Sequence, residues 1–166
     1  MKNLKKFLIA TILFVGFSQS AQAQAKTAHV DFREIVTKMP AMIEAQKQLE
    51  NLQKTYEGEI NTMITEYRST LEKYEREAEQ KTDKENEDRG KELQDMEKRI
   101  QEYRQTAQKE IGQKEQDLMN PLIEKARAAI AKVGKAKGFQ YVLDSSTLLL
   151  ADGPDLTIDV KKDLGY

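Results

Sequence analysis

The chain of 166 residues contains no cysteine, no tryptophan, three prolines and a single histidine. The absence of cysteine excludes disulfide bonds, a cysteine nucleophile and a lipid carried on a cysteine. His29 alone cannot provide both a catalytic triad and a metal site, so we interpret it as a structural residue beside a strand. No phosphate-binding loop or calcium loop matches the sequence either. We therefore expect no enzyme activity, no catalytic residue, no cofactor and no metal.

Residues 1–23 have the pattern of an export signal. Three lysines at positions 2, 5 and 6 precede a short apolar core, and Ala21-Gln22-Ala23 places small residues at the cleavage positions. A membrane anchor is the alternative, but it needs about 20 apolar residues, roughly twice the length of this core. We expect cleavage after Ala23.

Cleavage would leave a mildly acidic mature chain. The signal carries three lysines and no acid, so 24 basic residues remain against 28 acidic residues. This balance disfavours nucleic acid as the main partner. Charged side chains make up 33% of the sequence, and we interpret most of them as solvated helix faces.

The stretch from Ala41 to Lys137 has one proline and isolated glycines, and its apolar residues recur every three or four positions. This spacing predicts amphipathic helices with a single apolar stripe. The stripe is interrupted at 75–90, which we interpret as the exposed tip of an antiparallel hairpin between helices at 41–80 and 84–137. The spacing drifts from strict heptads, so we expect an irregular coiled coil. Arms of roughly 40 residues would reach about 60 Å.

The N-terminal segment of the mature chain is predicted to form a strand and a short helix. Residues 27–32 alternate between apolar and polar as in a strand, and 33–39 can form one or two helical turns. Pro40 suits the first turn of the long helix. Pro121 should kink the returning helix or mark a joint in it.

The C-terminal segment is predicted to add more strands. The long helix should end at Gly138, followed by strands at 139–143 and 147–151 that are joined by a hairpin-like turn at 144–146. Residues 155–157 would form a last strand or a cap, and 159–164 a final helical turn.

These segments predict an α+β fold that is mainly α. A helical-hairpin arm at 49–118 would be rooted in a small β-rich body built from 24–48 and 119–166. A body this small and without disulfides has a marginal core. We therefore expect the body to oligomerise.

Several motifs occur in a fixed order around this hairpin. Ala28-His29-Val30-Asp31-Phe32 precedes it, Pro121-Leu122-Ile123-Glu124-Lys125 and 137–144 follow on the return, and 155–160 ends the chain. In this order the chain resembles the Skp/OmpH family of periplasmic chaperones. The resemblance implies a homotrimer with three arms around a central cavity. It also implies a periplasmic holdase that binds unfolded outer-membrane proteins without ATP.

The resemblance and the apolar pattern together suggest three groups of residues. The residues expected to bind clients on the arm are Ile60, Met63, Ile64, Tyr67, Leu71, Tyr74, Met96, Ile100 and Tyr103. Those expected in the oligomerisation body are Val30, Phe32, Ile35, Leu122, Ile130, Val142, Leu143, Leu148, Leu149, Leu150 and Ile158. Gly58, Gly112 and Pro121 are the expected hinges.

Two alternatives stay open at this point. The apolar arm residues can instead join the two helices to each other, and the whole chain can be a structural coiled-coil spacer or assembly scaffold without clients. Some family members have basic tips that capture anionic lipid. Here acids outnumber bases at 75–90, so lipopolysaccharide is disfavoured as a ligand and binding to anionic vesicles should be weak and insensitive to salt.

Overall fold

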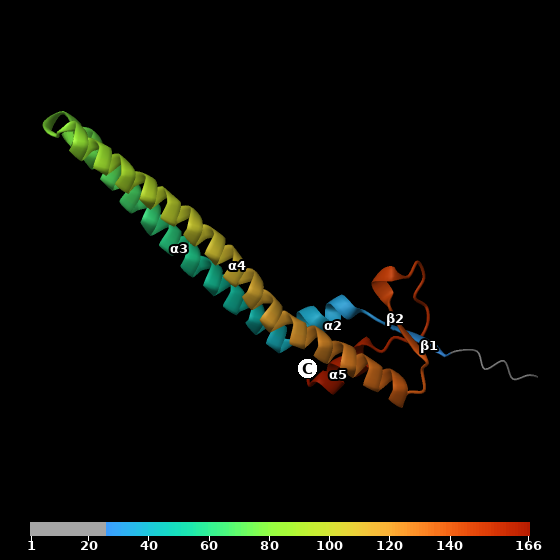
Figure 1. Cartoon of the computed structure of the whole chain (residues 1–166). Helices are drawn as coiled ribbons and strands as arrows, with labels where there is room; N and C mark the ends of the chain where they lie inside the picture. Colours follow the sequence, from blue (N-terminus) through green and yellow to red (C-terminus); the bar gives the residue numbers. More distant parts are fainter. Residues whose placement is uncertain (1–25) are drawn as a thin grey trace, which may run out of the picture.

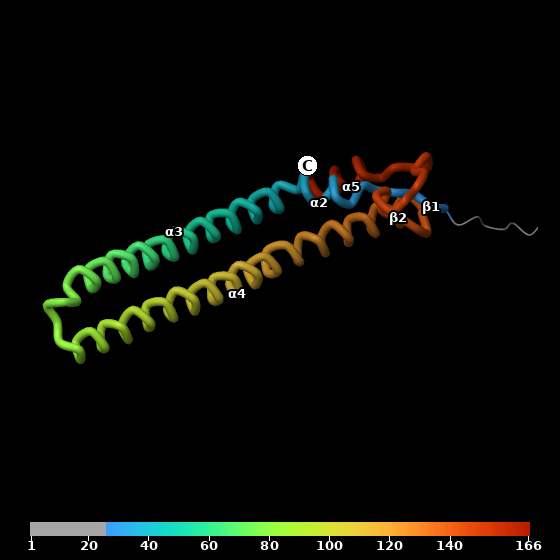
Figure 2. The backbone as a smooth tube through the Cα atoms, turned by 90° about the horizontal axis from the view of Figure 1, so that it is seen from above, coloured from blue at the N-terminus to red at the C-terminus, as the bar shows by residue number. Residues whose placement is uncertain are grey.

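The computed structural model describes residues 26–166, and the predicted signal at 1–23 lies outside the described residues. Two long helices, α3 (Pro40–Glu77) and α4 (Asp83–Ala136), lie side by side and form an arm that projects from a small body (Figure 1, Figure 2). With 38 residues, α3 is about 57 Å long. The prediction of a mainly helical fold with a long antiparallel hairpin is confirmed.

The body is assembled from both ends of the described chain. Its elements are β1 (Thr27–Val30), α2 (Phe32–Lys38), β2 (Tyr141–Asp144), a 3-10 turn (Ser145–Thr147) and α5 (Thr157–Leu164). The end of α4 and the start of α3 complete it (Figure 1).

Local chemistry determines where α2 and α3 begin. The Asp31 side chain accepts a hydrogen bond of 2.7 Å from the Glu34 backbone N–H and so caps α2. Pro40 occupies the first turn of α3, and the preceding Met39 has an extended backbone with ψ of 123°, as a residue before proline prefers. The predicted start of the long helix is therefore confirmed.

The tip of the arm is shorter than the predicted 75–90 segment. Helix α3 continues to Glu77, a 3-10 turn follows at Ala78–Gln80, and α4 already begins at Asp83. Thr82 and Glu85 form a capping box, in which each side chain bonds the backbone N–H of the other residue. The segment lacks large apolar residues but is rich in good helix formers, and these favour helix up to the turn.

Glycines allow two features at the other end of α4. Gly138 has a φ of +76°, and the Phe139 N–H bonds the Gly134 carbonyl at 2.9 Å, which ends the helix as predicted. Gly134 lies against β2, because a Cβ there would stand 2.7 Å from Cγ2 of Val142. Glycine at this position thus allows β2 to approach the helix.

The sheet differs from the prediction. Strand β2 pairs in parallel with β1, with Thr27 opposite Tyr141 and Val30 opposite Asp144. The predicted hairpin is wrong, because Asp144 caps a 3-10 turn through the Ser146 N–H and the segment 147–151 forms no strand. In the described chain the body contains one two-stranded sheet, so the predicted β-rich body is not confirmed.

The C-terminal segment stabilises the body through backbone hydrogen bonds and ion pairs. His29 exchanges backbone hydrogen bonds of 2.9 Å with Pro154 and Leu156 on the free side of β1. Helix α5 then packs on the core and is tied to α2 and α4 by ion pairs. These pairs are Lys161–Glu34 at 2.6 Å, Lys132–Asp163 at 2.5 Å and Lys137–Asp159 at 2.7 Å. The buried core contains Ala28, Val30, Ile35, Met39, Met42, Ala126, Ala129, Val133, Leu156 and Val160.

Helix α4 continues through Pro121 to Ala136. The predicted joint is therefore not a helix end. A proline removes one backbone hydrogen bond, and this loss is small beside the many bonds that continue on both sides in a helix of 54 residues.

Candidate functional site

The apolar side chains predicted to bind clients lie along the contact between α3 and α4, which we call the seam. Ile100 is buried, with 8% of its surface exposed. The other eight are half-buried: Ile60, Met63, Ile64, Tyr67, Leu71, Tyr74, Met96 and Tyr103. A helix facing only one other helix cannot cover its whole apolar stripe. The seam therefore joins the two helices and also leaves apolar surface accessible to solvent.

Four tyrosines bond glutamates of the facing helix across the seam. The Tyr67 hydroxyl donates to Glu97 at 2.6 Å, and the Tyr74 hydroxyl to Glu92 at 2.5 Å. The other two pairs are Tyr56 with Glu110 and Tyr103 with Glu59. These bonds supply part of the joining function that the sequence left open for the arm residues.

The carboxylates shift the ionisation of their tyrosine partners. The hydrogen bond to a glutamate, followed by burial, raises the pKa of Tyr56, Tyr67 and Tyr74 above its ordinary value. The neutral phenol is thus the form that the joined arm favours. Tyr56 also stacks at a tilt against Tyr103, with ring centroids 5.7 Å apart.

The sequence-based site set missed Tyr56 and all four glutamates. Tyr56 belongs to the apolar stripe by its spacing, so periodicity can find it. The glutamates resemble the many other acids on the arm, and only the register between the two helices shows which acid faces a tyrosine.

The end of the seam nearest the tip is held by a compact polar cluster. The Arg89 guanidinium bonds Glu77 at 2.5 Å and lies 4.4 Å from the centre of the Tyr74 ring. The bond to Arg89 lowers the pKa of Glu77. The Asn86 amide also donates to the Ala78 carbonyl at 3.0 Å. Tyr74, predicted to meet clients, is therefore covered on one face by Arg89.

Midway along the arm the seam opens into a groove of about 530 Å³. Ile60 and Ile111 contribute apolar surface to it, and Ala107 and Gly112 leave space because their side chains are small or absent. A Cβ on Gly112, or on the other predicted hinge Gly58, would meet no atom within 4 Å. Neither glycine is required by packing.

The outer faces of the two arm helices differ in chemistry. At helical spacing, α3 exposes small uncharged residues on the side away from α4: Asn51, Thr55, Gly58, Thr62, Thr65 and Ser69. The three threonine hydroxyls in this set bond the backbone carbonyl four residues earlier. On the corresponding side, α4 exposes charged residues: Lys84, Lys91, Asp95, Lys98, Glu102 and Lys109.

The residues predicted for the oligomerisation body separate into two groups. Val30 and Ile35 are buried in the core of the single chain, and Phe32, Leu122, Ile130, Val142 and Leu148 are half-buried. Leu143, Leu149, Leu150 and Ile158 are exposed, and Leu149 is completely so. We call Leu148–Leu150 the leucine segment. It leaves its apolar side chains largely in solvent.

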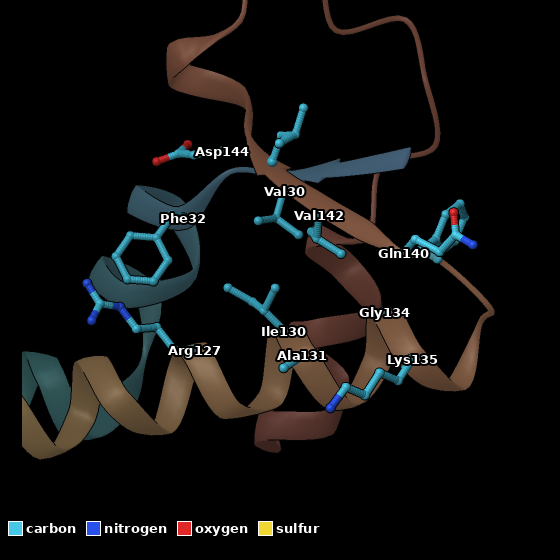
Figure 3. Close-up of a pocket in the computed structure, with 12 residues that line it drawn as sticks. Val30, Phe32, Arg127, Ile130, Ala131, Gly134, Lys135, Gln140, Val142 and Asp144 are labelled. Atoms are coloured by element: carbon cyan, nitrogen blue, oxygen red, sulfur yellow. The ribbon is translucent and has the colours of Figure 1, made fainter. Parts of the chain in front are cut away.

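A second groove, of about 490 Å³, lies in the body between β2 and α4. Figure 3 shows Val30, Val142 and Ile130 converging on this space, with Phe32 at one side. Arg127 and Lys135 project from α4 beside it. We call it the body groove. It combines apolar walls with two cations at its edge.

The family model for outer membrane proteins of the OmpH-like kind matches residues 26–164. The chain belongs to the OmpH-like family. The resemblance inferred from the ordered motifs is thereby confirmed.

The fold is similar to that of a solved OmpH-like protein. This is the crystal structure of an OmpH-like protein from Caulobacter crescentus, which has been proposed to be an outer membrane chaperone. The TM-score is 0.77 at 18% identity, over 87% of this chain and 86% of the other. A search of curated protein sequences gives no significant match.

Two further observations concern the described residues, 26–166. None of their helices has the length and apolar character that a membrane crossing requires. They also contain no cluster of three or more histidine, cysteine or acidic side chains arranged to hold a metal ion.

Proposed function

We propose that this OmpH-like chain is an ATP-independent holdase of the periplasm. It binds unfolded outer-membrane β-barrel proteins between the arms of a homotrimer and prevents their aggregation. The half-covered seam is the observation that carries the proposal. Apolar and aromatic side chains recur along an arm of about 57 Å, and nearly all of them keep part of their surface in solvent.

Such a surface suits an unfolded client. An extended strand exposes alternating apolar side chains and unpaired backbone groups. Methionines such as Met63 and Met96 adapt their shape to different partners, and tyrosines offer both an apolar ring and a hydroxyl. Each contact is weak, but several arms acting together raise the effective concentration and retain the client.

The arms need a common base for this mechanism. The exposed leucine segment supports assembly of the body, because large apolar side chains at full exposure mark an interaction surface. Three copies would place three arms around one cavity, as the resemblance to the Skp/OmpH family implies.

Suppression of aggregation tests the function. A urea-unfolded outer-membrane β-barrel is diluted into buffer with the mature chain, and light scattering is followed. We expect scattering to fall to a low level at one trimer per client. Scattering equal to that in an albumin control would contradict the holdase.

One observation favours a second candidate, a structural spacer without clients. The tyrosine hydroxyls of the seam are all bonded to glutamates of the facing helix, as a rod that only needs to stay joined would require. If one trimer per client leaves the light scattering of the client unchanged, this result would support the spacer.

The charge of the tip predicts how strongly the arm binds anionic lipid. Acids outnumber bases at 75–90, so we expect weak binding to anionic vesicles that salt does not change. A flotation assay measures this, and strong binding that is lost at high salt would contradict it.

A further inference from the structure

We propose that the groove midway along the arm is a binding site for aromatic side chains of an unfolded client strand. We call it the arm groove; it lies between Tyr56 and Ile60 of α3 and Arg104, Ile111 and Gly112 of α4. The inference rests on the proposed function, in which the client is an outer-membrane β-barrel, and it names the side chains that the arm selects. The strands of such barrels carry girdles of aromatic residues at both membrane interfaces.

Gly112 keeps the arm groove open. Its φ is not positive, because in the described chain only Gly138 and Gly165 have a positive φ. A Cβ at Gly112 would meet no atom within 4 Å, and alanine is more favourable than glycine inside a helix. Neither the backbone nor the packing of the single chain therefore requires this glycine. The absent side chain instead leaves room for an occupant that comes from another molecule.

The arm groove has the size and the apolar surface that a large side chain needs. Tyr56, Ile60 and Ile111 are half-buried, and Ala107 is 4% exposed. The volume of about 530 Å³ lies within the range of about 300–1,000 Å³ that is typical of ligand pockets. The α4 residues that line the groove span 104–115, which is roughly 17 Å of helix. An extended strand of about five residues has the same length.

Tyr56 and Arg104 favour an aromatic ring over an aliphatic side chain. The Tyr56 hydroxyl bonds Glu110 and its ring packs against Tyr103, but neither partner lines the groove. The Tyr56 ring is thus held in position while the groove stays free. Arg104 is exposed and forms no ion pair or hydrogen bond within residues 26–166. A client ring between them can pack edge to face on Tyr56 and place its own face against the guanidinium.

The arm of a second copy does not offer a suitable ring. The described arm contains four aromatic residues, and all four are tyrosines that bond a glutamate of the facing helix. A client strand that has not yet folded has free aromatic side chains. We therefore assign the arm groove to the client.

Filling the groove tests the assignment. Leucine is a good helix former, and a leucine at 112 would lean toward the preceding turn and Gln108, which also lines the groove. With the assembled mature chain, Gly112→Leu should raise the Kd for a dye-labelled β-barrel, kept unfolded in dilute urea, by about tenfold. Fluorescence anisotropy measures the Kd. Gly58→Leu, on the outer face of α3, is the matched control and should change the Kd less than about twofold.

A second client tests the preference for aromatic rings. In this client every girdle tyrosine, phenylalanine and tryptophan is changed to leucine. The wild-type chain should bind it about tenfold more weakly, and Gly112→Leu should cause no further loss, because the two changes remove the same contact. Arg104→Gln should weaken binding of the aromatic client about threefold and leave binding of the leucine client unchanged.

The outcomes separate this inference from the proposed function. A wild type that binds the aromatic client, together with equal affinity in Gly112→Leu and Gly58→Leu, would overturn the arm groove and leave the holdase intact. An equal loss with both clients in Gly112→Leu would overturn the preference for aromatic rings.

Two further measurements complete the test. Circular dichroism shows whether the helices of each variant are intact, and mass measurement in solution shows its assembly. A change of assembly in Gly112→Leu but not in Gly58→Leu would make a second copy the occupant and overturn the assignment to the client. A wild type that binds neither client would overturn the proposed function and the inference with it.

Discussion

The body and the arm bury their apolar side chains to different extents. In the body, residues of β1, α2, α4 and α5 surround one another, and Ile35 and Val160 have no exposed surface. Along the arm, a seam residue has a single facing helix, and only Ile100 and Ala107 are buried beyond the root of the hairpin. The body can therefore hold a fixed shape, whereas the arm keeps apolar surface available for contact.

Replacing an isoleucine by alanine in each region should give the largest difference in stability between the body and the arm. Ile35→Ala removes a fully buried side chain and should lower the free energy of unfolding by about 2–5 kcal/mol. Ile60→Ala on the half-exposed seam should cost clearly less, because the cavity it leaves is open to water. Urea unfolding followed by circular dichroism measures both. Equal losses would show that the seam is as closed as the core.

Alanine substitutions at one glycine in each region should change the stability of the body and of the arm in opposite directions. Gly134→Ala places a methyl 2.7 Å from Val142 and should destabilise the body by about 1–3 kcal/mol. Gly112→Ala on the arm meets no atom within 4 Å and should stabilise its helix by up to about 1 kcal/mol. Thermal unfolding of the two variants measures these opposite signs. Destabilisation by Gly112→Ala would mean that the arm needs the glycine as a hinge.

The tyrosine bonds make the arm sensitive to high pH. The pKa of Tyr67 is raised by its bond to Glu97, so the folded arm holds the phenolic proton more tightly than the unfolded chain. The stabilisation is complete below the ordinary tyrosine pKa of about 10 and is lost as pH rises through the raised value. We expect the melting temperature to fall in this alkaline range.

Phenylalanine provides the matched control for the alkaline range. A variant with Tyr56, Tyr67 and Tyr74 all changed to Phe should lose most of the pH dependence, because it has no proton to release at these sites. An unchanged alkaline slope would assign the effect to other groups.

The smallest expected effect is at the tip. The bond from the Thr82 backbone N–H is the main cause that lowers the pKa of Glu85 to about 2. The stabilisation by this cap is present above the ordinary glutamate pKa and is lost as pH falls through about 2. NMR titration of the Glu85 carboxyl measures it, and a titration near the ordinary value would show that the capping box is open. Glu85→Gln should remove the acid-dependent part.

The sequence predicted the arm better than the body. Helical periodicity depends on neighbours three and four residues apart, so 41–80 and 84–137 were close to the helices at 40–77 and 83–136. The strand at 147–151 failed for a different reason. Leu148, Leu149 and Leu150 have strand-like composition, and in the described chain β2 has a free outer edge. The 3-10 turn capped by Asp144 takes the place of a hairpin turn, so the segment does not return along that edge.

The candidate site was only partly predictable for a related reason. Spacing along one helix places Tyr67 and Met96 on the seam, and this requires no knowledge of the other helix. The partners of the tyrosines depend on the register between α3 and α4, as does the position of Arg89 over Tyr74. Neither helix alone carries that information.

Site-specific photocrosslinking to an unfolded outer-membrane β-barrel tests most directly whether the arm holds clients. A photoreactive residue is placed at the edge of the seam, at Thr70 or Arg99, and in the body, at Ala136 or Ser146. The account predicts strong crosslinks from both arm positions and few from the body. Crosslinks confined to the body positions would contradict it.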